Sequence, residues 1–242
     1  MRRSRRSKAE YGIDAPRMGM IILLAVIAAL VIAVLLHSST NTTAKAAGNI
    51  IFSLSPTGII ILFLALLYVK VEKFRHRDRM LNMLTWKGNE TVLDVGTGRG
   101  LLMIGAAKRL ITGKSFGIDI WNTKDLSNNS YRAVMANAIL EDVKEKVTVL
   151  NADAQNIPIE DNYFDYVVSN LCIHNISDRE GRAKACSEIM RVLKPGGVAL
   201  ISDFTHTREY AEEFKKMGYE TTRTFSFLIA PVLLHIVKVV KR

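Results

Sequence analysis

The fold of this chain is decided by the stretch TVLDVGTGRG, residues 91–100. It predicts a buried strand that leads through a glycine turn into a helix beginning near Leu101, because glycine lets the backbone approach a ligand closely. A dinucleotide-binding turn has the spacing G-x-G-x-x-G, whereas the third glycine here comes one position early. Asp94 would also repel a pyrophosphate and instead suits a ligand with an ammonium group. The turn therefore indicates a small charged ligand other than a dinucleotide.

Apolar runs after this turn alternate with helical stretches, which predicts a doubly wound α/β sheet. The predicted strands are 91–95, 115–119, 147–153, 164–170 and 198–201, followed by a terminal hairpin over 221–240. Asp119, Asp153 and Asn170 stand at or just beyond the carboxyl ends of three of these strands. Ligands of such sheets bind at the carboxyl ends of the strands, so these polar side chains are expected around one cleft.

These segments, from residue 91 to 204, resemble class I methyltransferases, which use S-adenosylmethionine (SAM). The resemblance implies a Rossmann-like, mostly parallel seven-stranded sheet, SAM as the methyl donor and no metal. It implies that Asp94 lies near the SAM ammonium and that Asp119 accepts the ribose hydroxyls. Trp121 covers the adenine or, alternatively, packs in the core. The other residues implied in SAM binding are Gly96, Thr97, Gly98, Gly100, Asp153, Ala154 and Asn170.

Methyl transfer from a sulfonium is an in-line displacement that needs alignment, and a base when the acceptor is a hydroxyl or an acidic carbon. His174 is the candidate base and Asn170 the second candidate catalytic residue, although such a histidine can also position its loop. The stretch 169–172, expected beneath the methyl group, lacks the Asn-Pro-Pro-Tyr type of sequence. This absence argues against nucleic acid or protein glutamine as the acceptor.

Two uncharged runs, 18–36 and 50–69, precede the domain. At ~1.5 Å per residue, each spans roughly the 30 Å hydrocarbon core of a bilayer. Neither run has a polar face, which favours two transmembrane helices over buried core helices. A cleaved signal peptide is the alternative for the first run, since small residues follow it at 44–47,.

The net charge of +10 is concentrated beside these two runs. Residues 1–17 carry +4 and residues 70–79 carry +3, with +1 between them, which leaves only +2 for 80–242. Basic clusters in these places are typical of cytosolic flanks and of contacts with anionic lipid headgroups, rather than of a nucleic-acid surface. The sequence thus predicts a two-pass integral membrane protein with both termini in the cytosol.

The expected organisation is a basic N-terminus at 1–17, transmembrane helices at 18–36 and 50–69, a non-cytosolic loop at 37–49, a basic juxtamembrane helix at 70–87 and a methyltransferase domain at 88–242. The turn of the terminal hairpin, 225–235, is unusually apolar. It is expected either to pack at the sheet edge or to form a lip that meets the bilayer or a lipophilic substrate. Cys172 and Cys186 have neither disulfide nor metal-site spacing and are expected to be free thiols,.

The predicted function is methyl transfer from SAM to a small, lipophilic or membrane-associated acceptor, with quinone precursors as one candidate class. The alternative is a catalytically silent SAM-binding or assembly protein, which would keep Asp94 and the glycines but lose an acceptor site. A nicotinamide-dependent oxidoreductase is disfavoured by the spacing of the glycines,.

Overall fold

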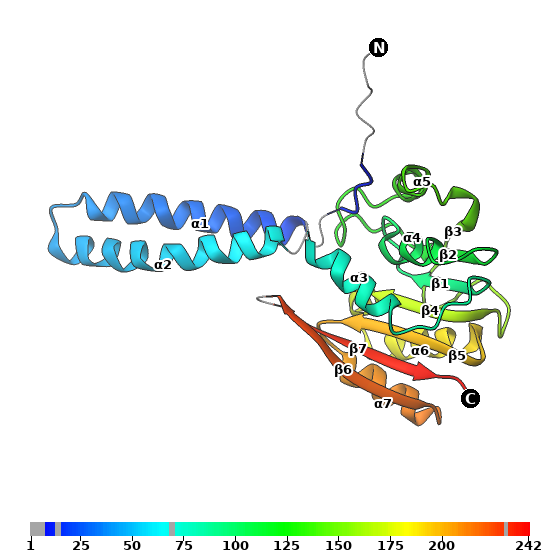
Figure 1. Cartoon of the computed structure of the whole chain (residues 1–242). Coiled ribbons are helices and arrows are strands. Elements are labelled where there is room, and N and C mark those ends of the chain that lie inside the picture. Colours follow the sequence, from blue (N-terminus) through cyan, green and yellow to red (C-terminus); the bar gives the residue numbers. More distant parts are fainter. Residues whose placement is uncertain (1–7, 13–15, 68–70, 230–231) are drawn as a thin grey trace, which may run out of the picture.

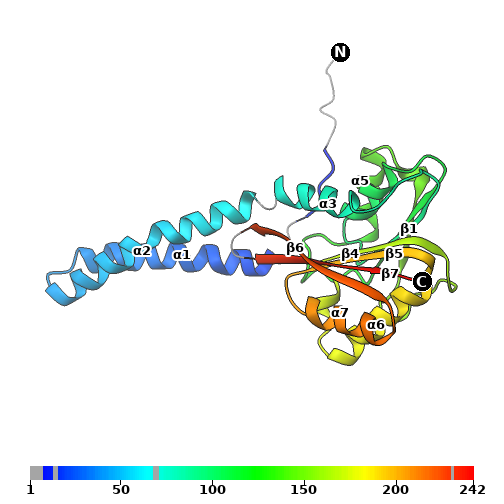
Figure 2. The same ribbon diagram turned by 60° about the horizontal axis from the view of Figure 1, so that its bottom comes forward.

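A computed structural model describes residues 8–12, 16–67, 71–229 and 232–242 of the 242-residue chain. It consists of a long helical hairpin and an α/β domain (Figure 1). The hairpin projects from the end of the domain at which α3 and the tip of β6 and β7 lie, and the view in Figure 2 agrees.

The two hairpin helices are α1 (Pro16–His37) and α2 (Thr42–Leu67), which run antiparallel. They pack closely where α2 has a glycine: a Cβ on Gly48 would lie 2.9 Å from the Ala33 carbonyl oxygen. Helices approach this closely where their interface residues are small. Because α2 begins at Thr42, most of the predicted loop 37–49 is helical, which corrects that prediction.

Within the described residues, α1 is the one helix that meets the length and apolarity of a membrane span, over Met20–His37. Of the two predicted transmembrane helices, only the first is therefore supported among the described residues. The second predicted span falls on α2, which contains Pro56 and several hydroxyl side chains, and its end at 68–69 lies outside the described residues. The predicted helix 70–87 is found as the shorter α3 (Lys73–Leu81).

The domain contains a seven-stranded sheet with the order β3-β2-β1-β4-β5-β7-β6, in which β6 and β7 are antiparallel to the rest. This confirms the predicted Rossmann-like, mostly parallel arrangement. The strands are β1 (Thr91–Val95), β2 (Lys114–Asp119), β3 (Val147–Asn151), β4 (Phe164–Asn170), β5 (Leu193–Asp203), β6 (Glu220–Ile229) and β7 (Val232–Val240). The remaining helices are α4 (Leu101–Ala107), α5 (Tyr131–Leu140), α6 (Arg179–Val192) and α7 (Thr207–Lys216).

Successive apolar residues of the strands point to opposite faces of the sheet, as the strand period requires. On one face, Val92 and Val168 pack with residues of α3 and α4. On the other, Leu93 and Val167 pack with residues of α6 and α7. Both faces are thus buried beneath helices, and the carboxyl ends of the parallel strands are left to form a site.

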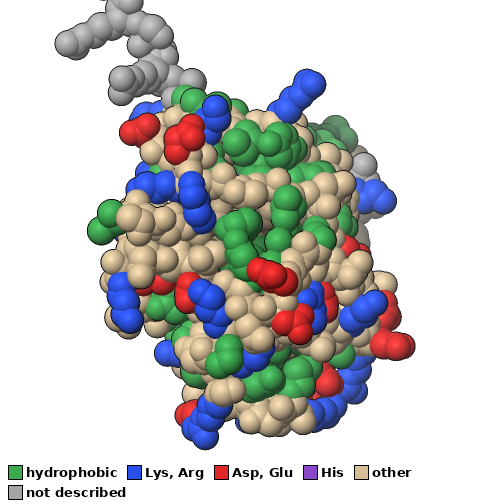
Figure 3. Space-filling model, turned by 90° about the vertical axis from the view of Figure 1, so that its right-hand side faces the viewer, with side chains coloured by type: hydrophobic (Ala, Val, Ile, Leu, Met, Phe, Trp, Pro, Cys, Tyr) green, Lys and Arg blue, Asp and Glu red, His purple; other side chains and the backbone are tan. Residues whose placement is uncertain are grey.

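The face of the domain shown in Figure 3 carries basic and acidic side chains interspersed with one another. No block of one sign dominates this view, which agrees with the net charge of only +2 for residues 80–242. On this face, the arrangement does not resemble the basic stripe of a nucleic-acid-binding protein.

Candidate cofactor and active site

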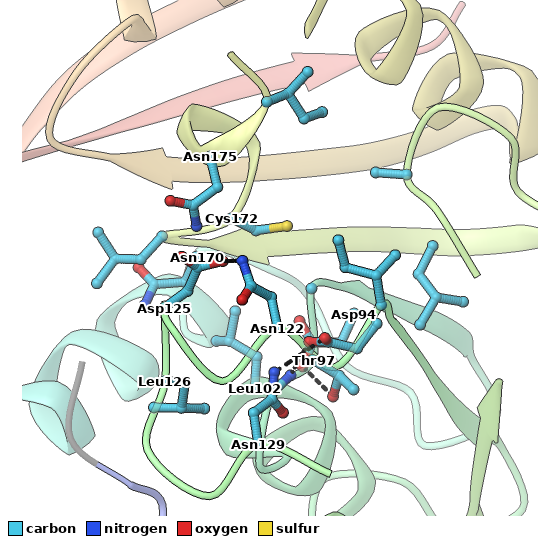
Figure 4. Close-up of a pocket in the computed structure, with 18 of the residues that line it drawn as sticks. Asp94, Thr97, Leu102, Asn122, Asp125, Leu126, Asn129, Asn170, Cys172 and Asn175 are labelled. Atoms are coloured by element: carbon cyan, nitrogen blue, oxygen red, sulfur yellow. Dashed lines mark hydrogen bonds between the residues drawn. The ribbon is translucent and has the colours of Figure 1, made fainter. Parts of the chain in front are cut away.

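A cavity of about 350 Å³ lies at the carboxyl ends of β1, β2 and β4, next to the point where the strand order reverses (Figure 4). Its size falls within the usual range of small-molecule sites. The predicted residues that line it are Asp94, Gly96, Thr97, Gly98, Asp119, Asp153, Ala154 and Asn170. Three other predicted residues, Gly100, Trp121 and His174, are not part of its lining.

Asp94, near the end of β1, is buried and already partly hydrogen-bonded. Its Oδ2 accepts from the Thr97 hydroxyl and from the Met103 backbone N–H, both at 2.9 Å. Burial raises the pKa of Asp94 to about 7, and the nearby Asp119 charge acts in the same direction. A cationic group in the cavity would favour the ionised form of this carboxyl.

Asp119, at the end of β2, is held by three donors. Its Oδ2 accepts from the Gly98 N–H at 2.7 Å, and its Oδ1 accepts from the Trp121 N–H at 2.6 Å and the Asn129 side-chain amide at 3.1 Å. Donors to the charged form fix the carboxylate in place while it lines the cavity. Asn129 was not predicted, because only the folded loop brings it to Asp119.

The glycine turn is needed for close packing against the floor of the cavity. Gly96 has φ +72°, and a Cβ there would lie 2.1 Å from the Cys172 sulfur. Both Gly96 and Thr97 donate their N–H groups to the Ile118 carbonyl, at 2.9 Å each. Gly100 also has a positive φ, +86°, and precedes the first residue of α4, so its role is at the start of that helix.

The floor of the cavity comes from the segment that follows β4. Figure 4 shows Asn170, Cys172 and Asn175 on one side of the cavity, opposite Asp94 and Thr97. Burial raises the pKa of the Cys172 thiol, so this side chain is an uncharged, compact part of the wall rather than a nucleophile,.

The side chains of His174 and Trp121 contact other residues and do not line the cavity. His174 Nδ1 lies 2.8 Å from Asp203 Oδ1, and its ring packs edge-on against Phe204. Trp121 packs edge-on against Tyr131, while the preceding residue, Ile120, lines the cavity. The backbone of Trp121 has φ +61°, a turn that the sequence does not signal.

Asp153 lies at the other end of the cavity, beyond β3. Its Oδ1 accepts the Gln155 N–H at 2.9 Å in a local turn, and Asp153 remains exposed. Ala154 beside it is buried and also lines the cavity. The Gln155 side-chain amide lies 3.4 and 3.3 Å from the two Asp153 carboxylate oxygens, and an exposed carboxylate can accept a further hydrogen bond from an amino group.

Two lining residues come from outside the predicted domain: Tyr11 and Lys73. Lys73 Nζ donates to the Gly12 carbonyl at 2.6 Å and to the Tyr11 carbonyl at 3.2 Å, and the Tyr11 hydroxyl donates to Glu141 at 3.2 Å. The segment before α1 is thereby fastened to α3 and α5. Sequence reasoning assigned both residues to the flanks of the membrane spans and missed them.

Residues 93–201 match the family model of a methyltransferase domain. The chain is 35% identical over 143 residues to phosphoethanolamine N-methyltransferase 2 of Caenorhabditis elegans, covering 59% of this chain and 30% of that protein. It is 30% identical over 142 residues to a ubiquinone/menaquinone biosynthesis C-methyltransferase of Vibrio cholerae (59% and 49%). It is 31% identical over 144 residues to sterol 24-C-methyltransferase erg6 of Schizosaccharomyces pombe (59% and 35%). The chain thus spans less than half the length of these relatives.

The fold is also that of solved structures. A SAM-dependent methyltransferase from Aquifex aeolicus superposes with a TM-score of 0.54 at 21% identity, over 67% of this chain and 88% of that one. The [4+2]-cyclase SpnF superposes with a TM-score of 0.58 at 16% identity, over 69% and 81%. These likenesses show the fold alone. The sequence match adds that residues 93–201 are similar to a methyltransferase domain, a kind of domain that typically takes its methyl group from SAM.

Proposed function

We propose that this protein is a membrane-anchored methyltransferase whose acceptor is a small lipophilic molecule held in or near the bilayer. The observation that carries the proposal is that residues on both sides of the helical hairpin line the cavity. The segment before α1 supplies Tyr11 to the cavity wall, and the helix that follows the hairpin supplies Lys73. The names of two relatives, acting in quinone biosynthesis and on a sterol, agree with a lipophilic acceptor.

The cofactor assignments follow from the charges around the cavity. In the proposal, Asp94 faces the ammonium of SAM, Asp119 accepts the ribose hydroxyls, and Asp153 with Ala154 meets the adenine edge. Bound SAM would supply an electrophilic methyl group on a sulfonium. The chain would align the acceptor above Asn170 and Cys172, since in-line transfer depends chiefly on alignment.

The candidate base, His174, is paired with Asp203 and does not line the cavity. In the proposal His174 positions its loop. Its ring Nδ1 lies 2.8 Å from Asp203 Oδ1, and its backbone N–H donates to Asp203 Oδ2 at 3.2 Å. This pairing supports the positioning role weighed from the sequence. Asn170, which lines the cavity, is the better-placed polar group toward an acceptor.

The hairpin supports a two-pass topology. α2 runs alongside α1 and exposes large apolar side chains, among them Ile50, Phe52, Leu54 and Phe63. If α1 crosses a bilayer, α2 shares it, and both ends of the hairpin return to the side of the domain. Basic flanks favour the cytosol for that side. A cytosol-dependent reporter should work after Arg242 and fail at Thr42; activity at both positions would contradict the topology.

The function is tested by incubating membranes that contain the full chain with methyl-labelled SAM and then separating lipid from protein. Label in the lipid extract is expected, and it should fall sharply in the Asp119→Ala variant. Label confined to protein or nucleic acid would overturn the acceptor class. SAM binding without transfer to any fraction would favour the silent SAM-binding alternative.

A further inference from the structure

The last two strands extend beyond the rest of the sheet. Pairing between β5 and β7 ends at Asp203 and His235. Beyond it, β6 and β7 continue to pair with each other, through Phe227 with Leu234, Leu228 with Leu233 and Ile229 with Val232. Residues 227–229 and 232–234, here termed the terminal ribbon, thus project as a two-stranded extension at the end of the domain nearest the helical hairpin (Figures 1 and 2).

The terminal ribbon consists of apolar residues in both strands, with a sequence that reads FLI on one side and VLL on the other. Leu233 is 49% exposed and Phe225 at the base of the ribbon is 56% exposed, whereas Leu234 is buried. A two-stranded extension is marginally stable in water, and large apolar side chains exposed together on a projection mark a place where something else binds.

The base of the ribbon is fastened to the helix that follows the membrane hairpin. The register shifts between Phe225 and Phe227, which leaves Ser226 at an irregularity. The Ser226 hydroxyl lies 3.0 Å from His76 Nδ1 and accepts from Arg79 Nη1 at 3.2 Å, both on α3. Since α3 comes directly after the hairpin, the ribbon and the apolar helix α1 are held at one end of the molecule.

Charge at this end fits an anionic surface. Residues 70–79 carry a net +3; Arg75 has a side chain that is 68% exposed, and it pairs with Glu72 at 2.6 Å. Arg223, on β6 before the ribbon, is exposed as well. Apolar side chains that project beside basic ones are typical of elements that dip into a bilayer interface.

We propose that the terminal ribbon inserts into the same anionic bilayer that α1 spans, as a second membrane contact of the catalytic domain; this rests on the membrane anchoring proposed above. One residue, His76, links this membrane contact to the cavity. His76 Nε2 lies 3.1 Å from Asn170 Oδ1 in the cavity floor, and its Nδ1 contacts the ribbon base. The domain is thus held with its acceptor side against the membrane rather than tethered freely.

The test uses the full chain in vesicles of phosphatidylcholine and phosphatidylglycerol whose acyl chains carry bromine, which quenches tryptophan emission on contact. Leu233→Trp reports on the ribbon, and Thr222→Trp is the control, exposed on the same strand pair outside the ribbon. After subtraction of the parent emission, the 233 probe should be quenched on the order of twofold and the 222 probe unaffected, since inserted elements bury about 5–10 Å into the interface. Phe225→Trp, an aromatic exchange, gives a second probe should Leu233→Trp fail to fold, as judged by SAM binding.

The outcomes distinguish the proposed ribbon contact from the proposed membrane anchoring by α1. Quenching at 233 and not at 222 supports the proposal. If the protein sediments with the vesicles but the 233 probe is not quenched, the ribbon contact is wrong and the anchored methyltransferase stands. A 233 probe that is shielded without quenching, together with a doubled mass, assigns the ribbon to a second copy and overturns the lipid contact. Failure to sediment with vesicles overturns both the ribbon and the membrane anchoring.

Discussion

The cavity has one wall made by the glycine turn and another made by the segments that flank the helical hairpin. In the first wall, backbone N–H groups of Gly98 and Met103 hold the carboxylates of Asp119 and Asp94. In the second, Lys73 Nζ bonds the Tyr11 carbonyl across 62 positions of sequence. The first wall follows from neighbouring strands and their turn. The second wall forms only when the helical hairpin brings Lys73 back beside Tyr11. The two walls should therefore respond differently to substitution.

In the first wall, made by the glycine turn, Gly96→Ala should cause the largest loss of SAM binding. The added Cβ would lie 2.1 Å from the Cys172 sulfur, so the turn must move away from Cys172. Overpacking of this kind typically costs about 1–3 kcal/mol of folding stability. Because SAM would have to bring the turn back at that cost, its affinity should fall by up to about a hundredfold in calorimetry. Gly196→Ala is the matched control, since Gly196 also has a positive φ, +81°, but an added Cβ meets nothing within 4 Å. Equal SAM binding by the two variants would show that the close contact with Cys172 does not shape the site.

Asp119→Ala should come next. It removes the carboxylate proposed to accept the ribose hydroxyls and leaves the Gly98 N–H without its acceptor, so SAM binding should weaken by roughly 1.5–3 kcal/mol. Calorimetry with SAM and with its demethylated product measures the change. Unchanged binding would contradict the ribose assignment, and binding of NADH in place of SAM would contradict the cofactor itself.

The pH dependence of binding tests Asp94. Burial raises its pKa to about 7, so the carboxyl is mostly protonated at pH 6 and mostly ionised at pH 7.5. Because only the ionised form attracts an ammonium, the demethylated product should bind about eightfold more weakly at pH 6 than at pH 7.5. The profile should become flat in Asp94→Asn. A wild-type profile that is already flat would remove Asp94 from the ammonium site.

The smallest effect is expected at the second wall. Lys73→Met keeps an apolar stem but removes the bonds to the Tyr11 and Gly12 carbonyls, each net worth about 0.5–1.5 kcal/mol. The demethylated product should dissociate a few-fold faster, as measured by stopped-flow fluorescence. Arg75→Met, an exposed change on the same segment, is the control. If the two variants release the product at the same rate, the flanking segments are not part of the cofactor site.

Elements with local signals could be predicted from the sequence. The turn at 96–100 and the strand ends at Asp119 and Asn170 follow from glycine freedom and from the burial of parallel strands, and the structure confirms the sheet. The apolar run at 18–36 likewise predicted α1, because an uncharged run of that length is a property of composition. Helix boundaries were predicted less well. The helix α2 begins at Thr42, where the Asn41 side chain accepts the N–H groups of Thr43 and Ala44 at 2.9 and 3.1 Å.

The tertiary structure alone decided which side chains reach the cavity. Ile120 lines it in place of Trp121, since the backbone turns at φ +61° there, and His174 is held by Asp203. Tyr11 and Lys73 join the wall from either end of the hairpin. Side-chain direction depends on backbone torsions and on partners far away in the sequence, neither of which leaves a periodic signal, whereas strands and apolar helices repeat one preference over many residues.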